Sequence, residues 1–218
     1  MSVRERILAF YRRYPAMIAL TYFPFYLLGF VLVEQVVEPR YIIWCPLDDL
    51  IPFCEYFIVP YATWFVELAV IPLLLLQYDR KQYYYLCAVM FTGMTLCLGL
   101  YLIFPNGLDL RVEITRQNIF ADLVRLIQAV DTPTNVCPSI HVASAMAMDL
   151  AICRSVLGQR RWVRMLANSV FVLICLSTVF LKQHSVIDIF WGVAVTAVLH
   201  LVFSRRFMPE PTQELVHS

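Results

Sequence analysis

Apolar stretches long enough to cross a membrane occupy more than half of this 218-residue chain. A transmembrane helix needs about 20 mainly apolar residues. Six such stretches occur, at about residues 15–33, 57–77, 83–104, 140–157, 162–181 and 186–204. Only 15% of all residues are charged, compared with roughly 25% in an average soluble domain. The sequence therefore predicts an all-α membrane protein, a six-transmembrane-helix bundle.

The six stretches leave no room for a separate soluble domain. We expect a single membrane domain over residues 1–218, with a core at 57–206, a first span and outer loop at 1–56, and a short polar tail at 207–218. The loop between the third and fourth spans holds a further helical pattern, in Ile119, Phe120, Leu123, Ile127 and Val130. This pattern predicts an amphipathic helix at the membrane interface.

The charge of the chain limits its possible binding partners, and its cysteine spacing bears on metal and disulfide bonding. The net charge of +1 and the absence of a dense Lys/Arg run argue against nucleic acid as a partner. The expected partners are the lipid bilayer and a lipid substrate, and the oligomeric state is open. No Cys-x-x-Cys or similar pattern suggests metal ligands. Cys45 and Cys54 share one outer loop, where a disulfide could form if the loop faces an oxidising compartment.

The basic residues give the expected orientation. If the N-terminus is cytoplasmic, 12 of the 17 Lys and Arg residues fall in cytoplasmic segments, as the positive-inside rule requires. Both termini are then cytoplasmic. The loops that contain Arg111 and His184 and the start of the fourth span, which carries His141, lie together on the extracytoplasmic side. The compact length and the lack of targeting signals favour a prokaryotic plasma membrane over a eukaryotic endomembrane.

The first chemical motif is Pro138-Ser139-Ile140-His141, at the start of the fourth span. Proline suits the first turn of a helix. The N–H groups of Ser139, Ile140 and His141 would then point out of the helix start and attract phosphate. The Ser139 hydroxyl adds a donor, and His141 reaches a bound phosphate from one turn inside. A capped helix with an interfacial histidine is the alternative interpretation.

The second motif is His184-Ser185-Val186-Ile187-Asp188, between the fifth and sixth spans. Residues four apart share one face of a helix. A carboxylate that accepts the N–H of one imidazole nitrogen fixes the tautomer and leaves the other nitrogen free as a nucleophile. Such a pair is common by chance, so its weight comes from lying at the same end of the bundle as the first motif.

These motifs resemble the type 2 phosphatidic acid phosphatase superfamily, which also includes acid phosphatases and vanadium haloperoxidases. The family pattern is Lys-x6-Arg-Pro, then Pro-Ser-x-His, then Ser-Arg-x5-His-x3-Asp. The middle motif is filled by Pro138, Ser139 and His141, and the last by Ser177, His184 and Asp188. The resemblance extends from about residue 57 onward.

The resemblance implies roles for single residues. His184 would attack phosphorus, Asp188 would orient His184, and His141 would act as general acid and base. Phosphoryl oxygens would be held by Arg111, Ser139, the Ile140 N–H, Ser177 and, as a substitute cation, Lys182. The implied scheme needs no metal and no cofactor.

The chain also departs from the family pattern. Phe104 stands in place of the lysine, Val112 in place of the proline and Thr178 in place of the second arginine. Two of the three expected phosphate-binding cations are therefore missing. Lys182 could supply one of them or could simply anchor the chain at the interface. Sphingomyelin and inositol phosphorylceramide synthases depart from the strict pattern in a similar way.

Three functions remain open at this point. The first is a lipid phosphatase that hydrolyses a phospholipid or isoprenyl phosphate through a phosphohistidine. The second is a phosphotransferase that moves a lipid head group to an alcohol. The third is a non-catalytic binder or carrier of anionic lipids, although a binder has no need of an aligned His–Asp pair.

Overall fold

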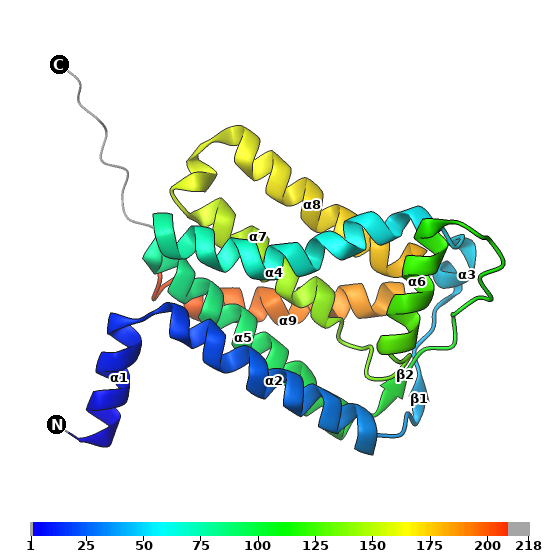
Figure 1. The fold of residues 1–218 in the computed structure, drawn as a ribbon, viewed down its shortest axis with the longest axis horizontal. Helices are drawn as coiled ribbons and strands as arrows, with labels where there is room; N and C mark the ends of the chain where they lie inside the picture. Colours follow the sequence, from blue (N-terminus) through cyan, green and yellow to red (C-terminus); the bar gives the residue numbers. More distant parts are fainter. Residues whose placement is uncertain (1, 209–218) are drawn as a thin grey trace.

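The computed structural model describes residues 2–208, and the long helices run side by side between two ends (Figure 1). These helices are α2 (Ala16–Val36), α4 (Ile58–Tyr78), α5 (Arg80–Ile103), α8 (Arg161–Phe180) and α9 (Val186–Ser204). The shorter helix α7 (Ile140–Arg154) packs against α4, α5, α8 and α9 at the centre of the bundle. The predicted all-helical class is confirmed for the described part of the chain. Residues 209–218 of the predicted polar tail lie outside it.

Five segments within residues 2–208 are long and apolar enough to cross a membrane: Ala16–Val36, Glu55–Tyr78, Arg80–Ile103, Arg161–Phe180 and Val186–Ser204. They correspond to five of the six predicted spans. The fourth stretch, 140–157, instead forms the 15-residue helix α7. At 1.5 Å per residue, α7 is about 22 Å long, which is less than the roughly 30 Å of a bilayer core. The six-span count is therefore supported for five spans only.

Helix α7 is short because Ser155 is extended and a 3₁₀ turn, η2 (Leu157–Gln159), follows it. The helix suits the centre of the bundle because small side chains cover much of its surface. Its buried small residues are Ala143, Ser144, Ala145, Ala147 and Ala151. Small residues let neighbouring helix backbones approach closely. The first turn of α7, which carries His141, is thereby fixed against the surrounding helices.

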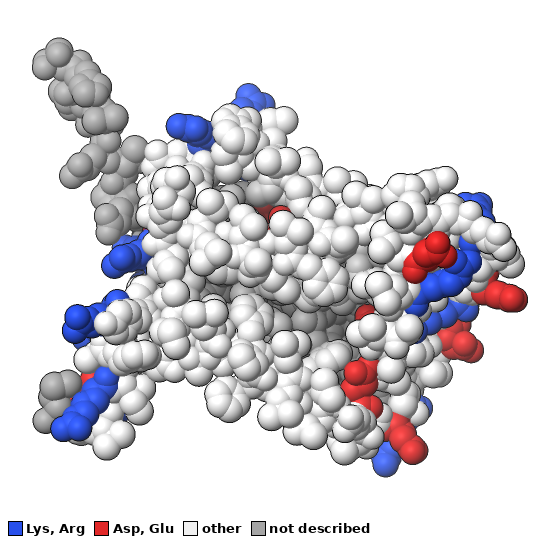
Figure 2. Space-filling view, viewed as in Figure 1, with Lys and Arg blue, Asp and Glu red and all other residues white. Residues whose placement is uncertain are grey.

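Charged residues gather at the two ends of the molecule, and the face drawn in Figure 2 is almost uncharged between them. The left-hand end carries α1 (Val3–Arg13) and the end of α9 (Figure 1). Lys and Arg predominate at this end in Figure 2, whereas most Asp and Glu side chains lie at the other end. This arrangement fits a protein that spans a membrane several times.

The end opposite α1 is built from loops and short elements. These are β1 (Tyr41–Ile42), α3 (Pro46–Leu50), η1 (Glu55–Phe57), β2 (Asn106–Gly107) and α6 (Ile119–Val130). Strands β1 and β2 are parallel and join the first outer loop to the loop after α5. Below we call this region the outer end, as a structural term only.

Helix α6 has the bounds that the apolar pattern predicts, and Asn118 caps it by accepting the N–H of Ala121. Its apolar residues line one face of the helix, and only part of that face is buried in the protein. Val124 and the neighbouring Ala121 are fully buried, whereas Ile119 and Val130 are 68% and 74% exposed. The location at a membrane interface stays a prediction.

Carboxylates fasten the outer end to the helices. Glu34, near the end of α2, accepts hydrogen bonds from the N–H and the hydroxyl of Thr132. Glu55, which is fully buried, forms an ion pair with Arg116 at 2.7 Å and accepts a bond from Asn118. These contacts fix the loops before and after α6 relative to the bundle.

Candidate active site

The two predicted motifs meet at the outer end of the bundle. His184 Nδ1 lies 3.2 Å from Asp188 Oδ2, and His184 Nε2 lies 3.3 Å from His141 Nδ1. Asp188 is fully buried and His184 is 6% exposed. The three side chains thus form a row in which His184 stands between a carboxylate and a second imidazole, although 43 residues separate the two histidines.

The row is positioned first by the start of α9. Ser185 is the N-cap, and its hydroxyl oxygen accepts the N–H of Ile187. Asp188 returns the contact, because its Oδ2 accepts the Ser185 N–H at 2.8 Å. This capping box satisfies free N–H groups of the first turn. The same carboxylate oxygen faces His184, so the helix cap and the histidine share one acceptor.

The turn before α9 directs His184 into the site. The N–H groups of Gln183 and His184 both donate to the carbonyl of Thr178, at 2.9 and 3.1 Å. Lys182 adopts a left-handed conformation with φ of 57° to close this turn, which is unfavourable for a residue with a Cβ. Its ammonium group is buried and donates to the Asp48 carbonyl at 2.6 Å. This contact ties Lys182 to the first outer loop, and no contact with the histidines accompanies it among the hydrogen bonds of residues 2–208.

Asp48 holds the start of α9 from the opposite side. Its carboxylate is 2% exposed and accepts bonds from the Cys45 N–H, the Ser185 hydroxyl and the Val186 N–H, at 2.8, 2.6 and 2.9 Å. The first outer loop therefore supports the turn that carries His184. Cys45 and Cys54 in this loop are free thiols in the structure, so the disulfide considered from sequence is not formed.

We expect Asp48→Ala to destabilise the protein by about 3 kcal/mol, because one buried and two partly buried donors lose their carboxylate acceptor. Thermal unfolding in detergent should occur on the order of 5–10 °C lower than in the parent. Asp49→Ala is the matched control, since Asp49 is exposed and binds only the exposed Trp44 indole in the described structure. Equal unfolding temperatures for the two variants would contradict the supporting role of Asp48.

The first motif departs from its predicted geometry in two details. Helix α7 begins at Ile140 with Ser139 as N-cap, so Pro138 precedes the helix and is not in its first turn. The Ser139 N–H donates to the Asp188 carbonyl at 3.2 Å and is not free to hold a phosphate. The N–H groups of Ile140 and His141 remain in the first turn, which has no intrahelical acceptors. Ser139 itself is fully buried and its hydroxyl oxygen caps Val142.

The segment before α7 is held by one buried amide. The Asn106 Oδ1 accepts the N–H groups of Val136 and Cys137, and its Nδ2 donates to the carbonyls of Phe104 and Cys137. Because Asn106 is fully buried, this bracing fixes the path of the chain into Ser139 and His141. No pattern in the sequence around Asn106 predicts this role.

Arg111 lies beside the histidine row, as the family resemblance implies. Its guanidinium donates to the carbonyls of Gln128 and Asp131 and to Gln183 Oε1, at 3.1, 2.5 and 2.9 Å. Burial lowers the pKa of Arg111, while the nearby Asp131 carboxylate acts in the opposite direction. An arginine retains its charge under such shifts. The site therefore keeps one fixed cation.

Gln183 is a further polar residue that the sequence had not suggested. It is 3% exposed, and Arg111 orients its amide by binding Oε1. Within residues 2–208, the Gln183 Nε2 and the Arg111 Nε are buried without a hydrogen-bond partner. A buried unpaired donor is costly, so these two groups are ready to bind an anion beside His184. Its position next to His184 in the sequence is the one feature that could have indicated a role for Gln183 in the site.

The remaining predicted residues lie less favourably for binding. Ser177 is fully buried in α8 and its hydroxyl donates to the Ile174 carbonyl at 2.7 Å. Thr178, at the position of the missing arginine, donates in the same way to Cys175. Phe104, at the position of the missing lysine, stacks on Tyr41 with ring centroids 4.5 Å apart. The structure thus replaces the lysine by an aromatic contact between the outer loops.

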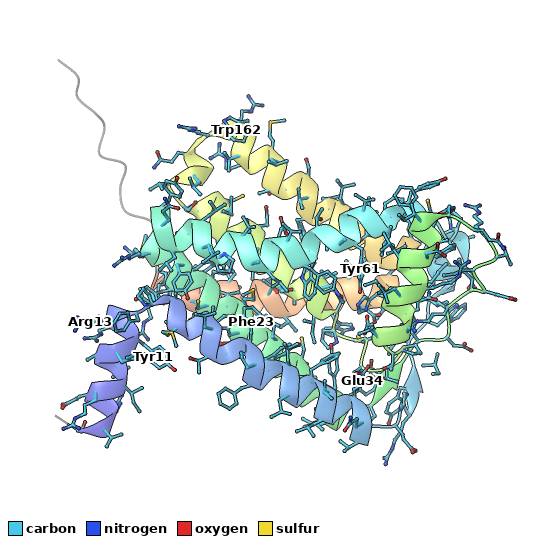
Figure 3. The ribbon with its side chains drawn as sticks, in the orientation of Figure 1. Tyr11, Arg13, Phe23, Glu34, Tyr61 and Trp162 are labelled. Atoms are coloured by element: carbon cyan, nitrogen blue, oxygen red, sulfur yellow. The ribbon has the colours of Figure 1, made fainter. Side chains whose placement is uncertain are left out.

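Tyr61 of α4 completes the surroundings of His141, and Figure 3 shows its position near the outer end. The Tyr61 hydroxyl lies 2.9 Å from His141 Nε2 and 3.4 Å from Asp131 Oδ2. Burial raises the pKa of the Asp131 carboxyl, while the nearby His184 and Arg111 favour its charged form. No sequence pattern indicates a role for Tyr61, because 80 residues separate it from His141.

Comparison with protein-family models matches residues 113–210 to the PAP2 superfamily. The matched segment is similar to this superfamily. It confirms the resemblance to the type 2 phosphatidic acid phosphatases, and it contains both histidine motifs, whereas Arg111 lies two residues before it. No curated protein matches the chain. The PAP2 segment and the apolar helices together fit a membrane protein of the phosphatase type.

Proposed function

We propose that this PAP2 protein is an integral-membrane lipid phosphatase that works through a phosphohistidine on His184 and needs no metal. The observation that carries the proposal is the row formed by Asp188, His184 and His141. Asp188 accepts the Nδ1–H hydrogen bond of His184, which leaves a lone pair on Nε2. That nitrogen lies 3.3 Å from the second imidazole. A phosphoryl group that replaces this contact and moves the two rings apart would meet a nucleophile on one side and an acid on the other.

In the first half-reaction, His184 Nε2 attacks phosphorus and the bond to the leaving oxygen breaks. His141 Nδ1 gives its proton to that oxygen, so the lipid alcohol leaves uncharged. The positive charge that develops on His184 is stabilised by Asp188, which lies 3.2 Å from Nδ1. In the second half-reaction, His141 Nδ1 takes a proton from water, the resulting hydroxide attacks phosphorus, and the P–N bond breaks.

Charge on the phosphoryl oxygens is balanced by groups around the row. Arg111 supplies a cation, the Ile140 and His141 N–H groups supply the positive end of α7, and the Gln183 Nε2 supplies a neutral donor. Donors fixed in advance by a folded structure contribute strongly to transition-state stabilisation. The buried Gln183 amide thereby compensates in part for the two family cations that this chain lacks.

A lipid is the proposed substrate because the site lies where the apolar helices end. Helix α6 covers this end, and its buried Val124 shares a cluster with Tyr61, while the rest of its apolar face, including Ile119 and Val130, is exposed. An exposed apolar face beside a phosphoryl site suits a substrate with a charged head group and apolar tails. Following the charge distribution, the proposed topology has cytoplasmic termini and an extracytoplasmic site in a plasma membrane.

The decisive experiment is phosphate release by the purified protein from a panel of lipid phosphates and isoprenyl diphosphates, in EDTA. We expect release that persists in EDTA and requires His184. Loss of activity on chelation, with recovery when a divalent cation is restored, would contradict metal independence. Equal release by the His184→Ala variant would contradict the histidine mechanism.

Head-group phosphotransfer is the second candidate, and one specific feature favours it. Phe104 and Thr178 replace two family cations, a departure that resembles the sphingomyelin and inositol phosphorylceramide synthases. A lipid donor offered with and without an alcohol acceptor separates the two functions. Turnover without acceptor supports the phosphatase, and turnover that requires the acceptor supports the transferase.

A further inference from the structure

Each histidine of the row has one nitrogen directed away from the other histidine. In His184 this nitrogen faces the Asp188 carboxylate, whereas in His141 it faces a hydroxyl group. Its Nε2 lies 2.9 Å from the Tyr61 hydroxyl, and its Nδ1 lies 3.3 Å from His184. The Tyr61 and Trp64 rings of α4 lie against the imidazole, with centroids 4.8 and 4.3 Å away. The ring is therefore fixed between α4 and the start of α9, with one nitrogen directed to each.

The hydrogen-bonding capacity of Tyr61 decides which nitrogen carries a proton. A phenol has one proton to donate. The ionised Asp131 carboxylate can only accept, and its Oδ2 lies 3.4 Å from the Tyr61 oxygen. If the phenol proton is directed to Asp131, the phenol oxygen is left to accept the Nε2–H of His141. Nε2 then stays protonated, and Nδ1 is the nitrogen that can gain and lose a proton.

We propose that Tyr61 and Asp131 are positioning residues that hold the Nε2–H of His141, so that Nδ1 alone exchanges protons during phosphoryl transfer. This inference rests on the proposed function and assigns the protonation states within it. With an anionic phosphoryl group bound, His141 reacts as an imidazolium that donates Nε2–H to Tyr61. After Nδ1 protonates the leaving oxygen, the ring is neutral and Nε2–H remains in place. Water returns the proton to Nδ1 when it attacks the phosphohistidine.

The burial of these groups makes the relay effective. Tyr61 is 1% exposed, and burial disfavours a charged imidazole unless acceptors meet its N–H groups. The Tyr61 oxygen, itself polarised by Asp131, supplies such an acceptor. Asp131 is fixed through its backbone, because Arg111 donates to its carbonyl oxygen and leaves the carboxylate to Tyr61.

The titratable and charged groups around His141 come from α4, from the start of α9 and from the loops around α6. His184 and Asp188 approach from the start of α9, Tyr61 from α4, and Arg111 and Asp131 from the loops around α6. Glu34 of α2 acts on both Arg111 and Asp131. In the variants proposed below, Arg111, Glu34 and the histidine row are unchanged, so a shift in pH dependence reports on Tyr61 and Asp131.

The test compares the pH dependence of kcat/KM for Tyr61→Phe and Asp131→Asn with that of the parent. Activity requires protonated His141, so the rate falls as pH rises through its ionisation. Both substitutions remove support for the imidazolium, and we expect this basic limb to move to lower pH by about one unit, with roughly a tenfold loss above it. Substrate ionisation is common to all variants and cancels in the comparison.

A matched control and a double variant make the test specific. Tyr26→Phe removes another buried phenol, one whose hydroxyl has no hydrogen-bond partner within residues 2–208, and should leave the limb unmoved. Because Asp131 acts through Tyr61, adding Asp131→Asn to Tyr61→Phe should produce little further shift. A full additional shift of the basic limb in the double variant would show that Asp131 acts independently of Tyr61, and would overturn the relay. Single variants that lose rate without any shift of the basic limb would overturn it as well.

The relay can also be tested when no lipid substrate is turned over. In ¹⁵N-histidine NMR spectra of the full protein, the titration midpoint of His141 should fall by about one pH unit in Tyr61→Phe, and the neutral ring should carry its proton on Nε2. A neutral ring protonated on Nδ1, or an unchanged midpoint, would contradict the relay. Absence of phosphatase activity in the parent would contradict the proposed function alone.

Discussion

His184→Ala should reduce phosphate release by at least about 10⁴-fold, because it removes the nucleophile and no other described residue can take its place in the row. The nearest nitrogen, His141 Nδ1, is only 3.3 Å away. It lacks a carboxylate partner on its own ring like the one that Asp188 gives to His184. The measurement is phosphate release in EDTA with the best substrate of the lipid panel.

His200→Ala is the matched control for this variant. His200 lies in α9, 14 residues after the helix begins at Val186, or about 21 Å along it, and its Nδ1 lies 2.6 Å from the Tyr85 hydroxyl. We expect it to retain activity in proportion to its folded fraction, as measured by gel filtration and thermal unfolding. A folded His184→Ala protein with activity within tenfold of the parent would contradict the assignment of the nucleophile.

Asp188→Asn should lower kcat by roughly 10²- to 10⁴-fold, as expected when a buried carboxylate behind a catalytic histidine becomes an amide. The asparagine oxygen can still accept the Ser185 N–H, so the cap of α9 is retained. His184 then no longer faces a negative charge, and its Nδ1–H tautomer and its developing positive charge both lose support. The loss should appear in kcat more than in KM, because the ground-state complex requires less charge stabilisation than the transition state.

Asp122→Asn makes the same chemical change outside the site. Asp122 lies on α6 in an exposed ion pair with Arg125, and surface pairs contribute little to stability. Its kinetics should match those of the parent. If Asp188→Asn is folded and also keeps parental kcat, the carboxylate has no role in activating His184.

The sequence predicts the spans and the histidine row because both depend on local patterns. Apolar stretches near 20 residues define the long helices, and the four-residue spacing of His184 and Asp188 predicts their contact. The shared helix face was wrong in detail, because His184 lies in the turn before α9 and reaches Asp188 from there. The shortness of α7 could not be foreseen, because residues 155–157 are as compatible with helix as with the turn that forms. How much of the apolar face of α6 is buried depends on what lies beneath the helix, which the amphipathic pattern of one helix does not contain.

The supporting residues could not be predicted, since they are brought together only by tertiary packing. Tyr61 lies within an apolar span, where a tyrosine is usually a packing residue. Asp48 and Asn106 lie outside the long helices. Their roles become visible only in the folded structure, where Asp48 accepts a hydrogen bond from the start of α9 and Asn106 accepts one from the segment before α7. Lys182 illustrates the opposite error. Its closeness to His184 in sequence suggested phosphate binding, but the turn directs its ammonium group to the Asp48 carbonyl.

Trapping the covalent intermediate is the most direct test of the central claim. The parent protein, in EDTA, would be mixed briefly with a lipid phosphate labelled on phosphorus, denatured in alkali and analysed by peptide mass spectrometry. The account predicts an acid-labile, alkali-stable phosphoryl group on His184 that chases into free phosphate. Label on another residue, or hydrolysis under conditions that trap the intermediate with no phosphohistidine detected, would contradict it.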